Sequence, residues 1–402
     1  MAPALRYDDG EFKIHCLNKN VDAFVDNYFV TLEIVERDKN RKEVTPWSFN
    51  MFSKRDIIPG RRAKKGAFIQ MEDIIPALKR VAIYGSPGTG KTTLCKKIVY
   101  EFYKNRMWND IFAEIILIQL RGLRKEIFVE IGTINDLVAQ HLKCDSETVD
   151  FSNCLFILDG WDEISDLDRG TDSPHIIKLL KRIMSDHKVI MTSRPNANMT
   201  HIFRHADQVL EIQGFDEFNA RKYIKNVLNS GIQDDEANFI DFLDSVTVSD
   251  MITIPIILDI LLFTWEEIKT IRKQNSELTL TTLYEVMVLK LWNEFLPDDK
   301  RDKYQNLRDV IRADDGILYR ESVALSKIAR KCFEEGNLLF SWSYIESCDV
   351  DCMNALVKSR FLNAVNANQG NEGWKQYEFI HLTLCEFFTA LNYVLYTGHN
   401  RI

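Results

Sequence analysis

The sequence lacks a hydrophobic run long enough to cross a membrane. Its most apolar stretch, residues 252–265, is shorter than the ~20 residues that a spanning helix requires, and Asp259 interrupts it. The opening residues, MAPALRYDDG, contain no apolar core of a secretory signal. We therefore expect a cytoplasmic protein without membrane contact.

A disulfide framework and a strong charge of one sign are also missing. The 8 cysteines are scattered, and no second Cys or His pair stands near Cys348 and Cys352, which argues against a disulfide scaffold or a zinc site. The net charge of −8 gives no general attraction to nucleic acid. A basic stretch between residues 54 and 65 has two interpretations, a solvated linker or a contact to phosphate or nucleic acid.

What the chain does contain is an alternation of apolar strands and amphipathic helices. A length of 402 residues exceeds one compact core and indicates roughly two to four domains. The alternation between residues 81 and 212 predicts an α/β fold, a parallel sheet with helices on both faces. We expect strands at 28–35, 81–84, 114–120, 154–158, 188–191 and 208–212, and helices at 92–103, 134–142 and 176–184.

Beyond Gly214 the pattern becomes helical. We expect helices at 215–228, 254–265 and 283–295, the first of them capped by Asp216. From about Gly316 helices are expected at 322–335 and 377–396, with short apolar stretches between them that indicate some strand. The sequence thus predicts an N-terminal segment with a basic linker (1–77), an α/β domain (78–213), a helical domain (214–312) and a mixed C-terminal domain (313–402).

The strongest motif is GSPGTGKTT at residues 85–93, which matches the phosphate-binding pattern G-x-x-x-x-G-K-[ST]. It follows an apolar strand and opens a helix, where backbone N–H groups and the helix dipole favour phosphate. Lys91 is expected to reach the β- and γ-phosphates, and the Thr92 hydroxyl to ligate Mg²⁺. The predicted nucleotide-binding residues of this P-loop are Gly85, Ser86, Pro87, Gly88, Thr89, Gly90, Lys91, Thr92 and Thr93.

A second motif, CLFILDGWDE at residues 154–163, ends an apolar strand in an acidic turn. Asp159 at the end of this strand would lie beside the P-loop and hold the Mg²⁺ shell, as in a Walker B motif. Asp162 and Glu163 follow within reach of the γ-phosphate, and either one is a candidate to orient or deprotonate the attacking water. The alternative is an acidic turn that caps the next segment.

Three further residues have simpler interpretations beside functional ones. Arg194, in VIMTSRP at the end of a strand, either senses the γ-phosphate and stabilises transferred charge or is a surface arginine. Pro255, taken alone, is explained by the start of a helix. His381, in EFIHLTLCEFF, is explained by burial with a hydrogen-bond partner.

Together these segments resemble a NACHT-domain protein, the STAND-type NTPase class of the NOD-like receptors, over residues 78–395. The resemblance is carried by VAIYGSPGTGKTTLCKKIVYEF, FILDGWDEI, VIMTSRP, ITIPIILDILLFTW, LTLTTLYEVMVLKLW and YEFIHLTLCEFFTALNYVL, in family order. It implies that Arg194 belongs to the sensor strand, that Pro255 packs on the nucleotide, and that His381 contacts the β-phosphate of bound ADP. It also implies that residues 313–402 form a winged-helix domain.

The resemblance implies a switch that binds ATP or ADP with Mg²⁺, hydrolyses ATP slowly and forms a homo-oligomer on activation. The setting it implies is innate immune or defence signalling, with an effector or sensor protein as partner. Family members usually carry an effector domain and continue into leucine-rich or similar repeats, whereas this sequence ends at Ile402. We expect a fragment, a truncated member or a protein that recruits its sensor in trans.

The competing interpretation is a P-loop enzyme, such as a kinase or a GTPase, that acts on a separate substrate. No N/T-K-x-D element stands downstream of the P-loop to read guanine, and no second substrate motif is visible. The helix expected at 377–396 contains no Lys or Arg, which argues against DNA reading by that helix.

Overall fold

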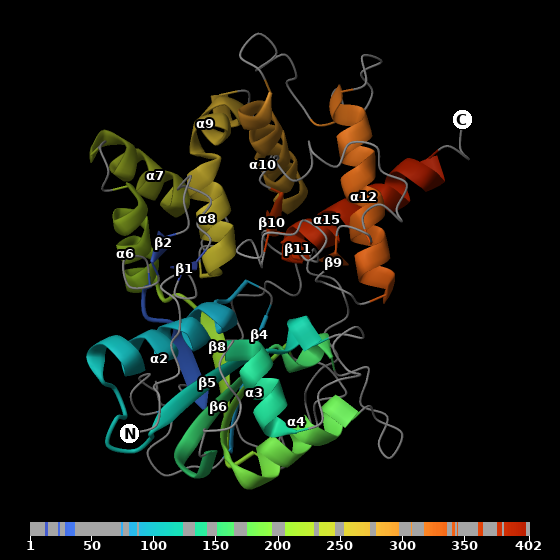
Figure 1. The fold of residues 1–402 in the computed structure, drawn as a ribbon. Helices are drawn as coiled ribbons and strands as arrows, with labels where there is room; N and C mark the ends of the chain where they lie inside the picture. Colours follow the sequence, from blue (N-terminus) through green and yellow to red (C-terminus); the bar gives the residue numbers. More distant parts are fainter. Residues whose placement is uncertain are drawn as a thin grey trace. The chain divides into compact units, whose positions relative to one another are not determined.

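The computed structural model describes part of the chain. The described residues are 13–14, 23–24, 29–36, 74, 80–86, 88–123, 133–142, 151–164, 175–194, 206–228, 233–245, 253–273, 279–296, 307, 317–335, 340–341, 344, 361–364, 376–379 and 382–398. The chain divides into two compact units, Met1–Asp259 and Ile260–Ile402. Each unit contains β-sheet of its own (Figure 1).

A six-stranded sheet forms the centre of the first unit, in the order β3-β8-β4-β7-β6-β5. Its strands are β3 (Glu33–Glu36), β4 (Arg80–Gly85), β5 (Glu114–Gln119), β6 (Cys154–Asp159), β7 (Lys188–Ser193) and β8 (Gln208–Gly214). Strands β4 to β8 run parallel, and β3 pairs antiparallel with β8 at one edge. The predicted α/β fold with a parallel sheet is therefore confirmed, and the strand expected at 28–35 joins the same sheet. Strands β1 (Lys13–Ile14) and β2 (Ala23–Phe24) precede it in the chain and pair with each other antiparallel.

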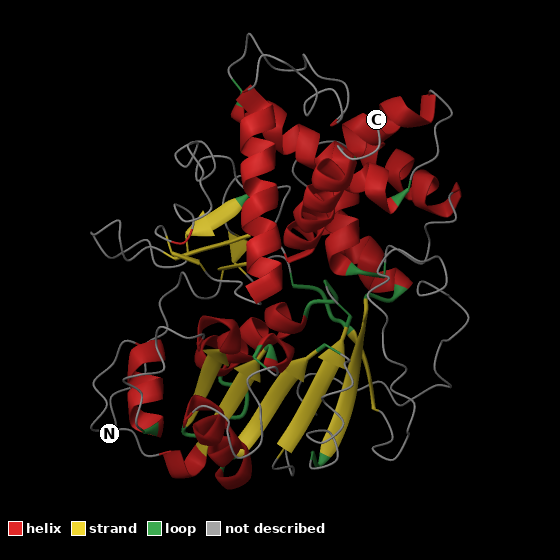
Figure 2. Cartoon of the chain, turned by 90° about the vertical axis from the view of Figure 1, so that its right-hand side faces the viewer, coloured by secondary structure: helices red, strands yellow, loops and turns green. Residues whose placement is uncertain are grey.

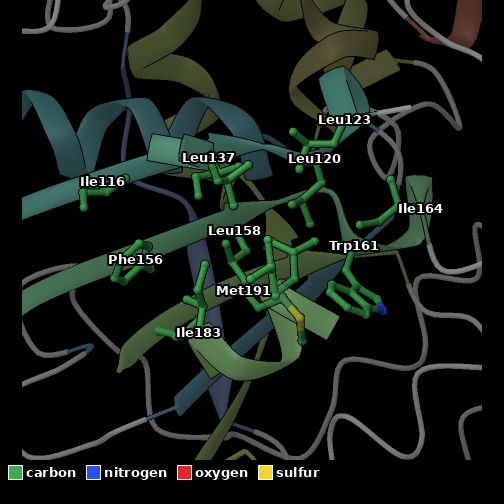
Figure 3. Packing of buried hydrophobic residues seen from close by; sticks show 14 of the residues in the cluster. Ile116, Leu120, Leu123, Leu137, Phe156, Leu158, Trp161, Ile164, Ile183 and Met191 are labelled. Atoms are coloured by element: carbon green, nitrogen blue, oxygen red, sulfur yellow. The ribbon is translucent and has the colours of Figure 1, made fainter. Parts of the chain in front are cut away.

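Helices cover both faces of this sheet (Figure 2). Every residue of β6 is buried, as is typical of a strand covered on both sides. Phe156 and Leu158 point to one face, where they join a buried cluster with residues of α3 (Ile134–Leu142) and α4 (His175–Asp186) (Figure 3). Side chains alternate along a strand, so Asp159 points to the other face, where its carboxylate meets Cys95 of α2 (Lys91–Asn105).

Among the described residues, α6 (Glu217–Leu228), α7 (Gln233–Ser245) and the first part of α8 (Pro255–Phe263) follow the sheet strands in the first unit, and α8 continues into the second unit. Helix α6 has the predicted cap, because the N–H of Asn219 donates to Asp216 Oδ1 at 2.7 Å. Helix α7 was not predicted, and α8 follows it. The hydroxyl of Tyr223 donates to the buried carboxylate of Asp259 at 3.0 Å, which explains how an acidic residue fits into the most apolar run of the sequence.

The second unit contains helices and a small antiparallel sheet. Its helices are α9 (Trp265–Lys273), α10 (Leu280–Phe295), α12 (Ile317–Glu335) and α15 (Leu382–Gly398), and its strands are β9 (Phe340–Ser341), β10 (Leu362–Ala364) and β11 (Gln376–Phe379). The strand order is β10-β11-β9. Helices α12 and α15 pack together, and the buried Asn392 amide donates to Ser326 Oγ at 2.9 Å. The strands expected in the C-terminal domain are therefore present.

The helix expected at 377–396 is wrong at its start. Strand β11 occupies Gln376–Phe379 and pairs with β9 and β10, and helix α15 begins only at Leu382. Within β11, Tyr377 and Phe379 are buried whereas Glu378 is partly exposed. Alternation of buried and exposed residues is typical of a strand. The pattern was hard to recognise in the sequence because the residues after the strand are also mostly apolar and lead directly into the helix.

The helix expected at 254–265 is divided at Thr264, which lies between the end of α8 and the start of α9. The Thr264 hydroxyl donates to the carbonyl of Ile260 at 2.7 Å. Across the residues that the structure describes, none of the helices combines the length and apolarity needed to cross a membrane. The domain boundaries predicted at 77/78, 213/214 and 312/313 and the winged-helix assignment stay predictions.

Candidate functional site

The P-loop joins β4 to α2, and glycines shape it. Gly88 (φ +75°) and Gly90 (φ +98°) have left-handed backbone conformations, which glycine adopts without the strain that other residues incur. Gly90 is the N-cap of α2, and no side chain caps this helix. The N–H groups of its first turn therefore suit an external anion. The Thr89 hydroxyl tightens the loop by donating to the Ser86 carbonyl at 2.9 Å.

Lys91 turns its ammonium into this loop. Its Nζ atom donates to the carbonyl oxygen of Gly85 at 2.7 Å and to that of Ser86 at 3.0 Å. Burial lowers the pKa of Lys91 to about 8, and the negative charge of Asp162 opposes this shift. A phosphate in the loop would favour the protonated form of the lysine, because an opposite charge nearby stabilises the ammonium.

Two segments outside the loop pack against its backbone. A Cβ atom on Gly88 would lie 2.2 Å from Cγ2 of Ile256, and the Ile256 N–H donates to the Gly88 carbonyl at 3.4 Å. A Cβ atom on Gly90 would lie 3.1 Å from Cδ1 of Leu32, just before β3. The start of α8 and the N-terminal segment thus both contact the P-loop, and Pro255 is the first residue of α8 at this place.

The carboxylate of Asp159 lies in a buried hydrogen-bond network. Thr192 Oγ1 on β7 donates to Asp159 Oδ1 at 2.6 Å and accepts from the N–H of Gly160 at 2.9 Å. The Cys95 thiol of α2 lies 3.8 Å from the same Oδ1, and burial raises the pKa of this thiol. Because β7 lies between β4 and β6, Asp159 does not adjoin the P-loop strand; it reaches the P-loop helix α2 through Cys95.

Asp162 and Arg194 form an ion pair at the ends of β6 and β7. Arg194 Nε lies 3.3 Å from Asp162 Oδ2, and the Arg194 backbone N–H donates to Oδ1 at 2.8 Å. The Ser193 hydroxyl lies 3.3 Å from the same Oδ1 and 3.0 Å from the Arg194 carbonyl oxygen. Ser193 pairs in register with Tyr84, the residue before Gly85, so Arg194 lies at the same edge of the sheet as the P-loop.

Glu163 lies against a different neighbour. It is the last residue of the 3₁₀ helix η6 (Trp161–Glu163), and its N–H donates to the Gly160 carbonyl at 3.0 Å. Gly160 has φ +87°, and a Cβ atom on it would lie 3.1 Å from Cδ of Glu163. The two acidic residues that the sequence left as equal candidates therefore differ: Asp162 contacts Arg194, and Glu163 packs over Gly160.

The arrangement fits a nucleotide with a divalent cation. The N-terminus of α2 and the Lys91 ammonium suit phosphates, and Thr92 and Asp159 are the predicted Mg²⁺ ligands. Mg²⁺ is usually bound through one or two carboxylates together with water and substrate phosphates. Among the described residues, no group of three or more His, Cys, Asp or Glu side chains is placed so that it could hold a metal ion by itself. Pro87 and His381 lie outside the described residues, and the roles of all the predicted site residues stay predictions.

Four residues contribute contacts at the site that the sequence did not assign: Thr192, Cys95, Leu32 and Ile256. Thr192 belongs to the same strand-end motif as Arg194, and this position was the signal in the sequence that could have indicated a contact at the site. Cys95 falls on the buried face expected for the P-loop helix. Leu32 and Ile256 are apolar residues in apolar segments, and only the tertiary fold brings them to the loop.

The sheet and its loop define a P-loop NTPase domain, a class of protein that binds nucleotides. The family model of the NACHT domain matches residues 79–230. Residues 79–230 are therefore similar to NACHT domains, and the resemblance that the sequence motifs indicated is confirmed.

Two curated relatives carry the same domain in their names. NACHT, LRR and PYD domains-containing protein 10 of Mus musculus is 24% identical over 325 residues, which cover 78% of this chain and 45% of that protein. NACHT, LRR and PYD domains-containing protein 3 of Bos taurus is 25% identical over 185 residues, covering 39% of this chain and 17% of that protein. The chain thus spans less than half the length of these relatives.

Solved structures show weaker likeness. A Signal Transduction ATPase with Numerous Domains (STAND) protein with a tetratricopeptide repeat sensor from Pyrococcus horikoshii is 14% identical with a TM-score of 0.32, covering 80% of this chain and 43% of that chain. The ORC2 protein of Aeropyrum pernix is 11% identical with a TM-score of 0.33, covering 79% and 89%. Both scores lie under 0.5, and the assignment rests on the NACHT match.

Proposed function

We propose that this chain is an ATP- and ADP-dependent signalling switch of the NOD-like receptor type, acting in innate immune or defence signalling. The observation that carries the proposal is the P-loop, in which the Lys91 ammonium lies against the carbonyls of Gly85 and Ser86. The NACHT match over residues 79–230 supports nucleotide binding and the type of switch. Thr92 and Asp159 hold Mg²⁺ in this proposal, and Glu163 acts on the attacking water in a slow hydrolysis.

A switch requires contacts that differ between its two nucleotides. In the proposed cycle, Arg194 contacts the γ-phosphate of ATP and His381 contacts the β-phosphate of ADP. ADP holds the C-terminal region, a winged helix in this proposal, in a closed state. Exchange for ATP releases it, and the open subunits form a homo-oligomer that recruits an effector or sensor protein.

The test is to identify the nucleotide that co-purifies with the 402-residue chain and to follow particle size after exchange to ATP. We expect bound ADP or ATP and an increase in particle size with ATP. Lys91→Ala is expected to abolish tight binding, whereas Lys104→Ala, at an exposed position in the last turn of the same helix, retains it. Near-normal ATP affinity in Lys91→Ala would rule out the site, and an unchanged particle size with turnover of a separate substrate would favour a P-loop enzyme.

A further inference from the structure

Two acidic residues at the end of β6 are candidates for the group that acts on water, and their contacts separate them. Both oxygens of Asp162 contact Arg194: Oδ1 accepts from the backbone N–H at 2.8 Å, and Oδ2 lies 3.3 Å from Nε in an ion pair. The Ser193 hydroxyl lies 3.3 Å from Oδ1 and 3.0 Å from the Arg194 carbonyl, and its single proton can be donated to either oxygen. The Asp162 carboxylate is therefore directed at the end of β7.

The ion pair between Asp162 and Arg194 is largely shielded from water. The side chain of Asp162 is 11% exposed and that of Arg194 is 24% exposed. Exposed pairs of this kind contribute little, whereas a pair that is shielded from water and hydrogen-bonded through its backbone fixes the geometry of both partners. The position of the Arg194 guanidinium thus depends on Asp162.

The sheet register shows where that guanidinium lies. Ser193 pairs with Tyr84, and the P-loop begins at the next residue, Gly85. Arg194 is one residue beyond this pair on the neighbouring strand. The Nε atom of the guanidinium faces Asp162, and a planar guanidinium is a group that can bind phosphate oxygens through two parallel N–H donors.

We propose that Asp162 is a positioning residue whose carboxylate holds Arg194 by its backbone N–H and its Nε atom so that the guanidinium meets the terminal phosphate. Glu163, which packs over Gly160, is then the carboxylate that acts on water. This inference rests on the proposed nucleotide switch. It predicts that Asp162 discriminates ATP from ADP, which a group acting only on water does not do.

The experiment compares the affinities of the full chain for a non-hydrolysable ATP analogue and for ADP, both with Mg²⁺. Asp162→Asn keeps an acceptor for the backbone N–H but removes the charge that holds Nε. We expect about a tenfold loss of analogue affinity, the order of one charge-assisted hydrogen bond, with ADP affinity nearly unchanged. Arg194→Gln should give the same selective loss, and the double variant should be no worse than either single variant.

A matched control exists in the same unit. Asp186 and Arg182 on α4 form a pair of the same type, with Arg182 Nε 3.4 Å from Asp186 Oδ2, but its side chains are 51% and 71% exposed. Asp186→Asn should leave both affinities unchanged. Asp162→Glu keeps the charge and moves the carboxylate by one methylene, so it should retain more analogue affinity than Asp162→Asn. It also serves as the test variant if Asp162→Asn does not fold.

Two results would overturn the inference. One is an unchanged ratio of analogue to ADP affinity in Asp162→Asn, or in Asp162→Glu if only that variant folds. If the single-turnover rate of that variant is also reduced at least a hundredfold, Asp162 is a group that acts on water. The other is additive loss in the double variant, because independent effects mean that Asp162 does not act through Arg194. Failure of the proposed function looks different: the unmodified chain would bind neither nucleotide, or Lys91→Ala would bind both normally.

Discussion

The Thr192 hydroxyl donates to Asp159 Oδ1 at 2.6 Å and accepts from the N–H of Gly160 at 2.9 Å. The single proton of the hydroxyl therefore points at the carboxylate, and the backbone amide occupies its acceptor side. The Cys95 thiol approaches the same Oδ1 at 3.8 Å. Because Oδ1 accepts from these groups, Oδ2 is the Asp159 oxygen that would face Mg²⁺ in the proposed site.

Thr192→Val should lower the affinity for Mg²⁺ and so raise the Mg²⁺ concentration at which nucleotide binding is half-maximal. Valine has the shape of threonine but cannot donate to Asp159 or accept from Gly160. Loss of a group that orients a metal ligand typically costs about 10–100-fold in metal affinity. The measurement is ATP-analogue affinity across a Mg²⁺ titration and in excess chelator. Thr192→Ser keeps the hydroxyl, so its Mg²⁺ midpoint should stay close to that of the unmodified chain. Equal Mg²⁺ midpoints for all three chains would contradict the orienting role.

Gly88→Ala should destabilise the P-loop and weaken nucleotide binding. Its φ of +75° is unfavourable for alanine, and the new Cβ atom would lie 2.2 Å from Ile256 Cγ2. Together, backbone strain and overpacking cost roughly 2–4 kcal/mol of unfolding free energy. Denaturant unfolding of the first unit measures this cost. In the Ile256→Ala background, Gly88→Ala should cost less unfolding free energy than in the unmodified chain, because the overpacking is relieved. It should still cost some, because the backbone strain remains.

Much of the first unit could be predicted from the sequence because its signals are local. The strand of β6 is a run of apolar residues that ends in Asp159, and the P-loop is a fixed pattern between a strand and a helix. The α3 helix has the predicted bounds, Ile134–Leu142. In each case the period of hydrophobicity and the turn residues agree, which is where reasoning from sequence is most dependable.

The strand order and the contacts between elements could not be predicted in the same way. Nothing local shows that β7 lies between β4 and β6, so Thr192 had no assigned partner before the fold was known. The distinction between Asp162 and Glu163 depends on which one meets Arg194 across strands. Within β11, the alternation of Tyr377 and Phe379 was hidden because apolar residues continue into the following helix.

Glu163→Gln should slow ATP turnover while Mg-ATP binding is retained. The amide has the size of the carboxylate but cannot accept a proton from water, and a positioned general base contributes about 10²–10⁴-fold to a rate. Single-turnover hydrolysis and analogue affinity should be measured on the same preparation. An unchanged rate in both Glu163→Gln and Asp162→Asn would exclude both residues from action on water.

Glu321→Gln should stabilise the second unit at neutral pH. Burial raises the pKa of Glu321, and its Oε2 has no hydrogen-bond partner among the described residues. The folded chain therefore keeps a proton that the unfolded chain loses above its ordinary pKa of 4.5. Stability is then lost as the pH rises from the ordinary pKa of glutamate to the raised pKa of Glu321. We expect the variant to be more stable than the unmodified chain at pH 7 and to show no gain below the ordinary glutamate pKa of 4.5.

A residue on the same helix gives a control of opposite sign for this pH effect. A hydrogen bond from Arg330 lowers the pKa of Glu334, so the contact adds stability that is present at neutral pH and lost in acid. Glu334→Gln should therefore shift stability downward at pH 7. Unfolding measured at pH 4 and pH 7 on both variants decides the matter, and shifts of the same sign would contradict the assignment for Glu321.

His381→Leu should speed ADP release and raise spontaneous self-association. In the proposed switch, the imidazole donates to the β-phosphate and so favours the closed ADP state, most strongly when it is protonated. A coupling of ~1–3 kcal/mol corresponds to about a 5- to 150-fold change in the open population. The measurements are the ADP off-rate and light scattering of the unmodified chain and the variant.

The His381 experiment also separates a switch from an enzyme that processes a substrate. His381 lies far beyond the P-loop in the sequence, so an effect on ADP release requires that the C-terminal region and the nucleotide communicate. An enzyme with an independent C-terminal domain gives no reason for such an effect. His381→Gln, which keeps a hydrogen-bond donor, should release ADP more slowly than His381→Leu. Equal off-rates and equal monomer fractions in all three chains would show a histidine that serves only the local packing.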